Sequence, residues 1–274
     1  MSSPDYYHYE AGHSNWARTV ADIRSGLKRW RLWSSMALRH FMGQYKGALI
    51  GPLWITVTTA MTASGLGLLY AQLFGRNIDE HLPYVTIALV VWAYMNTFAT
   101  SGTAVFNANA HIFKEYPLPL SMFPMRLVVI QMVNFAFRFL VLVGVMVIFS
   151  VPVTLTSLWA IPGFLLITWI GFWASLALGV INARFRDFGQ LVSAVFGFAF
   201  FITPIFWTTD RLGPYEFIVH YNPLYHMVQV VRGPLLGMGD LPVHFAVVSG
   251  IAVLSTVIGL AVYGRFSHRL PYWC

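Results

Sequence analysis

Apolar residues occur along the chain in six long runs that are separated by short polar segments. The runs cover about residues 49–74, 83–106, 127–150, 157–182, 188–207 and 242–263. About 20 helical residues cross the hydrocarbon layer of a bilayer, and a helix satisfies its own backbone hydrogen bonds there. Each run therefore predicts one membrane-spanning helix. The pattern predicts an all-α polytopic membrane protein, with residues 1–274 as a single domain and residues 49–263 as its six-span core.

The composition favours a membrane protein over an ordinary soluble domain. Of the 274 residues, 57% are hydrophobic and 10% are charged, whereas soluble domains carry about 25% charged residues. The N-terminal segment before the first apolar run is charged and lacks an apolar core of the required length, so we expect no signal peptide. The one cysteine, Cys274, excludes an internal disulfide framework and a cysteine-based metal site.

The distribution of basic residues predicts the orientation in the membrane. The net charge of +7 does not indicate a nucleic-acid partner, because the basic residues alternate by loop. With the N-terminus inside, the loops outside hold only Arg76, Arg211 and Arg232. The cytoplasmic side then holds thirteen: Arg18, Arg24, Lys28, Arg29, Arg31, Arg39, Lys46, Lys114, Arg126, Arg184, Arg186, Arg265 and Arg269. By the positive-inside rule, both termini are expected in the cytoplasm.

Residues 22–46 predict an amphipathic helix that lies in the membrane interface. One face of this helix carries the apolar side chains of Ile23, Leu27, Trp30 and Ala37. A neighbouring face carries the basic side chains of Arg24, Lys28 and Arg31. The alternative is a solvated basic tail.

A turn is needed between this helix and the first span. Gly43, Gly47, Gly51 and Pro52 stand at that place, and glycine tolerates unusual dihedrals while proline suits the first turn of a helix. The sequence predicts that these residues make the turn. The alternative is a Gly-xxx-Gly packing face.

Several kinds of chemistry are absent from the sequence. There is no G-x-x-x-x-G-K-[ST] phosphate loop and no H-E-x-x-H motif, and the histidines show no ligand spacing, so we expect no metal site. All acidic residues fall in loops or near interfaces: Asp5, Glu10, Asp22, Asp79, Glu80, Glu115, Asp187, Asp210, Glu216 and Asp240. A carrier driven by protons or sodium usually keeps a carboxylate inside the membrane. The energy for transport should therefore come from a partner.

Two cytoplasmic loops could bind such a partner. Residues 107–126 carry Lys114 and Glu115, and Pro117 should halt a short surface helix there. Residues 182–188, "NARFRDF", predict a tight polar turn between the fourth and fifth spans. The alternative interpretations are a simple connector and a pair of arginines that only sets topology.

The order of several motifs resembles one known family. These are "YKGALIGPLW", "FKEYPLPL", "NARFRDF", "TPIFW", "YNPLYHMVQVVRGPLLG" and the terminal "RLPYW", and the likeness covers about residues 27–273. The chain looks like the transmembrane subunit of bacterial polysaccharide-exporting ABC transporters, with the O-antigen branch most similar.

The resemblance implies a homodimer with two separate cytoplasmic ABC ATPase subunits. ATP and Mg would bind to the ATPase, and no cofactor would bind to this chain. Residues 107–120 would form the main coupling helix, 184–187 a second ATPase contact and 208–239 short external gating helices. The implied ATPase-coupling residues are Asn109, His111, Lys114, Glu115, Tyr116, Pro117, Arg184, Arg186 and Asp187, and those of the external gate are Tyr221, Asn222, Pro223 and Arg232.

Aromatic residues and one buried cation are candidates for a substrate path. Aromatic faces can cover sugar rings, and the candidates are Trp54, Tyr70, Trp92, Phe196, Phe200 and Trp207. Their alternative positions are lipid-facing surfaces and interfacial belts. Arg138 lies twelve residues beyond Arg126, about 18 Å into the membrane, where an isolated Arg costs about 2.5–3.5 kcal/mol. We expect it to meet a phosphate-linked headgroup or sugar hydroxyls, with Gln131 and Asn134 nearby; the alternative is pairing with backbone carbonyls.

The sequence thus predicts a transporter subunit and not an enzyme. We expect it to be the permease of an ATP-driven exporter that moves lipid-linked polysaccharide. It would lie in the bacterial inner membrane, in contact with membrane lipids. The alternatives are an exporter of a small hydrophobic drug or lipid, and a membrane-embedded glycosyl or acyl transferase.

Overall fold

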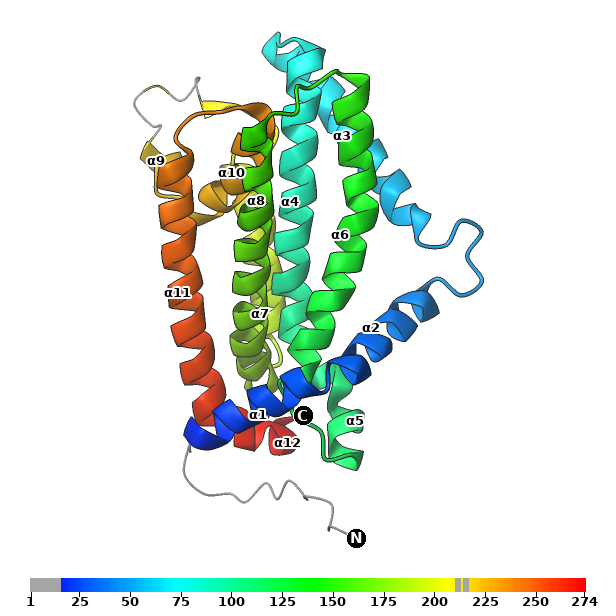
Figure 1. Cartoon of the computed structure of the whole chain (residues 1–274), viewed down its shortest axis with the longest axis vertical. Coiled ribbons are helices and arrows are strands. Elements are labelled where there is room, and N and C mark those ends of the chain that lie inside the picture. Colours follow the sequence, from blue (N-terminus) through cyan, green and yellow to red (C-terminus); the bar gives the residue numbers. More distant parts are fainter. Residues whose placement is uncertain (1–15, 210–212, 214–216) are drawn as a thin grey trace.

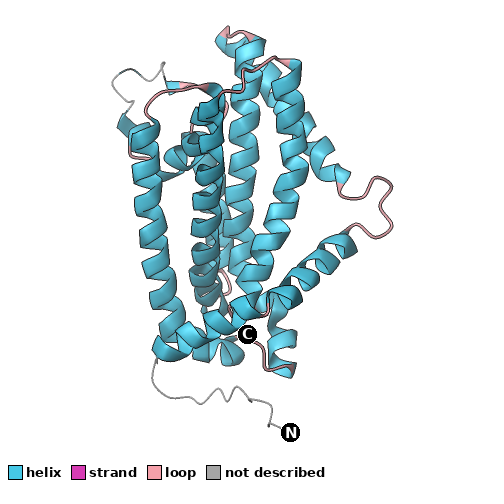
Figure 2. Ribbon diagram, in the orientation of Figure 1, coloured by secondary structure: helices cyan, strands magenta, loops and turns pink. Residues whose placement is uncertain are grey.

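The computed structural model describes residues 16–209, 213 and 217–274, and all regular structure in these residues is helical (Figure 2). Five helices are long and apolar enough to cross a membrane. They are α3 (Leu53–Phe74), α4 (Ile78–Ala104), α6 (Met122–Ile148), α7 (Ala160–Arg184) and α11 (Leu241–Phe266). The protein is therefore an all-α polytopic membrane protein, as predicted.

The fifth predicted span, residues 188–207, is a shorter apolar helix, α8 (Phe188–Ile202). Its 15 residues extend about 22 Å at about 1.5 Å per residue. The prediction continued this helix to residue 207, but Thr203 has extended dihedrals (φ −79°, ψ 131°) and precedes Pro204. A residue before proline is disfavoured in the helical region, so the helix ends there.

Helix α4 lies at the centre of the bundle, between α6 and α7 (Figure 1). Most of its residues are buried. Glycines on α7 let the two helices approach closely: a Cβ added at Gly171 would lie 2.5 Å from the ring of Phe98, and one at Gly179 would lie 2.6 Å from Val105. Small residues at such seams are the usual means of close packing in membranes.

The predicted interface helix over residues 22–46 is divided in two. Helix α1 (Trp16–Lys28) ends before Arg29, and α2 (Trp30–Gln44) follows it. Helix α1 crosses one end of the bundle, and α2 rises alongside α6 (Figure 1). The ring of Phe41 stacks on that of Phe137 at 5.9 Å, so α2 ends beside the middle of α6.

The turn between α2 and α3 uses two of the predicted glycines. Gly47 has φ of 86° and Gly51 has φ of 56°, values that favour glycine, so the prediction is confirmed for them. Gly43 belongs to α2, and Pro52 caps α3. Nothing in the described chain lies within 4 Å of a Cβ added at the three glycines, so they form no packing face within the chain.

Asp22 fastens α1 to the bundle. Its Oδ1 accepts a hydrogen bond from the backbone N–H of Leu120 at 3.0 Å, and its Oδ2 accepts one from that of Ser121 at 3.0 Å. The hydroxyl of Tyr263 donates to the same Oδ2 at 2.6 Å. One carboxylate thus joins α1 to the start of α6, where a helix N-terminus favours negative charge, and to the end of α11.

The two ends of the bundle carry different short helices (Figure 1). We call the end with α1 the basal end; it also holds η1 (Asn107–Asn109), α5 (Ala110–Glu115), η5 (Ser267–Arg269) and α12 (Leu270–Trp273). The opposite, distal end holds η2 (Leu155–Trp159), α9 (Phe217–His220) and α10 (Pro223–Leu236). The helices α9 and α10 confirm the prediction of short helices before the last span. Arg211 and the rest of 210–212, with 214–216, lie outside the described residues.

Candidate functional site

The first predicted coupling element is η1 followed by α5 at the basal end. Helix α5 ends at Glu115, and Tyr116 is extended (φ −123°, ψ 133°) before Pro117. The prediction that Pro117 halts a short helix is therefore confirmed. Phe113 anchors α5 because its buried ring lies 5.7 Å from that of Phe123. His111, beside this anchor, is exposed.

Asn109 differs from the other predicted coupling residues because it is half-buried and its side chain is hydrogen-bonded at both ends within the chain. Its amide donates to the carbonyl of Val105 at 2.7 Å, and its Oδ1 accepts from Arg126 Nη1 at 2.5 Å. It thus fixes η1 to the ends of α4 and α6. The remaining eight are exposed and are called the coupling set: His111, Lys114, Glu115, Tyr116, Pro117, Arg184, Arg186 and Asp187.

The second predicted coupling element is the turn between α7 and α8. The predicted tight polar turn is confirmed, since only residues 185–187 separate the two helices. Buried Asn182 holds it: its amide donates to the carbonyl of Thr103 at 2.9 Å, and its Oδ1 accepts from the N–H of Gly189 at 2.8 Å. Asn107 donates to the carbonyl of Asn182 at 3.4 Å, so the two coupling elements adjoin.

Four of the predicted path aromatics come together where α3, α4 and α8 meet. Tyr70 stacks on Phe206 with centroids 4.4 Å apart, and Phe206 lies 5.6 Å from Phe200. Trp92 lies 5.6 Å from Phe200 and 5.8 Å from Phe196. Trp92 is only 6% exposed, so its ring is covered by the chain itself.

The other two predicted path aromatics, Trp207 and Trp54, do not belong to this cluster. Trp207 donates from Nε1 to the carbonyl of Phe201 at 3.1 Å, and its own carbonyl accepts from Tyr84. Trp54 stands exposed in the first turn of α3.

Arg138 lies in the second half of α6 and is half-buried. Its Nη1 is buried and has no hydrogen-bond partner among the described residues, and Tyr45 lies within electrostatic reach. The predicted neighbours Gln131 and Asn134 bond to each other at 3.3 Å. A buried polar atom without a partner costs about 1–3 kcal/mol, so this atom is a candidate for contact with a ligand.

Arg232, predicted to lie in the outer loop, is fully buried in α10. Its Nη1 donates to the carbonyl of Pro204 at 2.8 Å, and its Nε donates to Gln229 at 3.1 Å. The guanidinium lies 3.9 Å from the ring centroid of Tyr84. This side chain therefore joins α10, α4 and the turn after α8.

The other external-gate candidates lie around the start of α10. Asn222 caps the helix by accepting from the N–H of Leu224 at 3.0 Å, and it donates to Thr203 at 3.0 Å. Pro223 occupies the first helical position. Tyr221 is 84% exposed and Pro223 is exposed as well, so both can contact another molecule.

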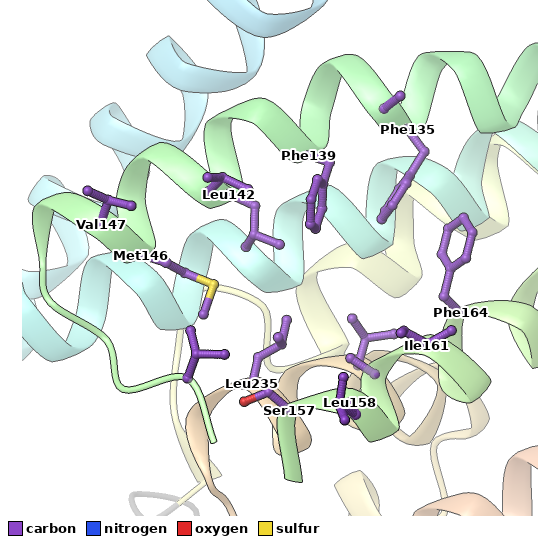
Figure 3. Close-up of a pocket in the computed structure, with 15 residues that line it drawn as sticks. Phe135, Phe139, Leu142, Met146, Val147, Ser157, Leu158, Ile161, Phe164 and Leu235 are labelled. Carbon is purple, nitrogen blue, oxygen red and sulfur yellow. The ribbon is translucent and has the colours of Figure 1, made fainter. Parts of the chain in front are cut away.

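An apolar cavity of about 570 Å³ lies near the distal end, between α6 and α7 (Figure 3). Helix α10 contributes Leu235, and η2 contributes Ser157. The rings of Phe135 and Phe164 lie 4.2 Å apart at one side of it. The other lining residues include Phe139, Leu142, Met146 and Ile161. Its chemistry suits acyl chains rather than sugars.

Sequence reasoning missed three basal features: the Asp22 clamp, the Asn182 bonds and the position of α12. Each depends on partners that are far away in the sequence. Asn182 and Thr103 are 79 residues apart, and Asp22 and Tyr263 are 241 residues apart. The motif "RLPYW" marked the α12 segment but gave it no role.

Comparison with known proteins bears on these features. A family model described as ABC-2 type transporter matches residues 31–236, well over half of the chain. Two relatives from Klebsiella pneumoniae, each named O-antigen export system permease protein RfbA, are 25% identical over 232 residues, which cover 82% of this chain and 88% of theirs. A protein of the same name from Myxococcus xanthus is 22% identical over 182 residues, covering 65% of this chain and 68% of its own.

Proposed function

Because the chain belongs to the ABC-2 type transporter family, we propose that it is the permease of an exporter that moves lipid-linked polysaccharide of the O-antigen type across the bacterial inner membrane. The names of the relatives from Klebsiella pneumoniae and Myxococcus xanthus support this substrate class. The exporter permease works as a membrane subunit and supplies no covalent chemistry. Its basal end faces the cytoplasm, and two copies form the pathway.

The observation that carries the proposal is the pair of adjoining coupling elements at the basal end. Their eight exposed side chains stand on elements that Asn109 and Asn182 fix to the ends of α4, α6, α7 and α8. A movement of the coupling elements would therefore be transmitted directly to the membrane-spanning helices. Two cytoplasmic ABC ATPase subunits, which bind ATP and Mg, dock there and drive transport.

The substrate path follows Arg138 and the aromatic cluster of α3, α4 and α8. Buried Nη1 of Arg138 offers its hydrogen bond to the phosphate of the lipid carrier, because charge-assisted bonds to phosphate are among the strongest that a guanidinium makes. The half-buried rings of Phe196 and Phe200 offer weak, repeated contacts to sugar rings.

Surface polysaccharide in a strain that lacks this chain tests the proposal. Wild-type protein restores the polysaccharide, and Arg138→Ala lowers it at least tenfold at equal protein abundance. Arg138→Lys retains the charge and restores part of the export, whereas Arg138→Gln does not. Wild-type export by Arg138→Ala would contradict the role of Arg138, and unchanged polysaccharide in the deletion strain would contradict the substrate class.

The apolar cavity favours one second candidate, export of a small hydrophobic drug or lipid. Such a substrate would fill the space between α6 and α7, and it would stimulate ATP hydrolysis by the complex without polysaccharide. Substitution of Ile161 by Trp would block it. If hydrophobic compounds stimulate hydrolysis and this substitution abolishes the effect while surface polysaccharide stays normal, the second candidate replaces the first.

A further inference from the structure

The C-terminal segment Leu270–Cys274 packs against both coupling elements. Helix α12 contacts α5 and α7 directly, at the basal end of the bundle (Figure 1). Leu270 is completely buried, which fixes the segment to the end of the bundle. The segment also lies beyond residue 236, where the match to the family model ends.

Trp273 and Cys274, at the end of the chain, lie close to members of the coupling set. The guanidinium of Arg184 lies 5.6 Å from the ring centroid of Trp273, and that ring also lies 5.9 Å from Phe266. Burial raises the pKa of the Cys274 thiol, while the positive charges of Lys114 and Arg186 act in the opposite direction. The last residues of the chain are therefore close to side chains from both elements.

The exposed part of this surface is aromatic and basic. Tyr272 is 72% exposed and is not needed to hold α12 in place, because Leu270 and Trp273 make the packing contacts. Around it, α5, residues 184–187 and residues 267–274 carry four exposed basic and two exposed acidic side chains: Lys114, Arg184, Arg186, Arg269, Glu115 and Asp187. An exposed aromatic within a charged rim is typical of an interface anchor.

We propose that Leu270–Cys274 is a third docking contact for the ATPase, placed between the two coupling elements, with Tyr272 as its anchor. The partner surface is acidic and contains a slot for the tyrosine ring. The inference rests on the proposed function, since it adds a contact to the same coupling surface. Because α12 touches both elements, the ATPase meets one continuous surface and not two separate contacts.

The single cysteine of the chain allows a direct test. The permease is purified and treated with a maleimide, alone and with its purified cognate ABC ATPase without nucleotide. The ATPase should slow the labelling of Cys274 at least tenfold. Protein labelled beforehand with a bulky maleimide should bind the ATPase at least tenfold more weakly. Equal labelling rates with and without bound ATPase overturn the inference.

Substitution at Tyr272 gives the second measurement. Loss of an aromatic anchor typically costs a factor of about ten or more in affinity, so Tyr272→Ala should weaken ATPase binding by that factor. The control is Tyr221→Ala, at a tyrosine of the distal end that is also mostly exposed (84%), which should leave the affinity for the ATPase unchanged. Unchanged affinity in Tyr272→Ala overturns the inference.

A third variant separates this inference from the proposed function. Arg186→Ala removes a charge from the coupling set itself. If Arg186→Ala weakens ATPase binding and Tyr272→Ala does not, the third contact is wrong and the coupling surface stands. If the ATPase binds both variants and wild type equally, both the third contact and the proposed coupling surface are wrong.

Discussion

Replacement of Asp22 by Asn should weaken the attachment of α1 to the bundle. One oxygen of the carboxylate accepts a hydrogen bond from the N–H of Leu120. The other accepts hydrogen bonds from the N–H of Ser121 and from the hydroxyl of Tyr263. An amide has only one oxygen, so in either orientation its NH₂ faces an N–H donor. At least one hydrogen bond to a charged acceptor is lost.

The magnitude follows from the number of bonds lost. A hydrogen bond to a charged group contributes about 1.5–3 kcal/mol, and every 1.4 kcal/mol corresponds to about a factor of ten. The equilibrium for opening of α1 should therefore rise by about ten- to a hundredfold. The spans themselves stay folded, because the clamp lies at their ends.

Hydrogen exchange in detergent micelles measures this opening directly. Amides of α1 should exchange about ten- to a hundredfold faster in Asp22→Asn, while those of α4 should be unchanged. The control Tyr263→Phe removes one of the three bonds and should have a smaller effect. Wild-type exchange rates for α1 in Asp22→Asn would refute the clamp.

Three further results are expected. Gly171→Leu should destabilise the protein by about 1–3 kcal/mol, seen as a lower melting temperature, because a Cβ at this position already overlaps the ring of Phe98; an unchanged melting temperature would contradict the close α4–α7 contact. Arg232→Gln should cost about 1.5–3 kcal/mol and speed hydrogen exchange in α10, since the bonds of a fully buried guanidinium are lost; equal exchange would show that α10 is held by other contacts. The maleimide rate of Cys274 should reach its half-maximum at higher pH in the folded protein than in the urea-unfolded chain. Burial raises the pKa of this thiol and the thiolate is the reactive form; coincident pH profiles would contradict its burial.

The sequence predicts most of the span positions because a run of about 20 apolar residues is rarely found outside a membrane span. The ends of the runs are less well predicted, since they depend on single residues. The first span begins at Leu53 and not at 49 because Gly51 and Pro52 complete a turn. The break at Arg29 between α1 and α2 has no proline beside it, and Gly26, three residues earlier, lies within α1.

Some features of the candidate site can be predicted from the local sequence, and others cannot. Exposure of the coupling set follows from local charge, and the end of α5 follows from Pro117. The roles of Asn109, Asn182 and Arg232 depend on distant partners. An amide or a guanidinium that holds two helices together has the same appearance in one sequence as one that faces water. Only the fold distinguishes these cases.

The short length of α8 has a consequence for the surrounding lipids. Its outer surface is apolar, with Leu191, Val195, Phe198 and Phe201 exposed, yet the helix is about 22 Å long and a typical hydrocarbon layer is about 30 Å thick. Such hydrophobic mismatch is relieved when the bilayer thins beside the helix. We therefore expect the bilayer to be thinner along α8, and the function of the protein to depend on the acyl-chain length of the host bilayer.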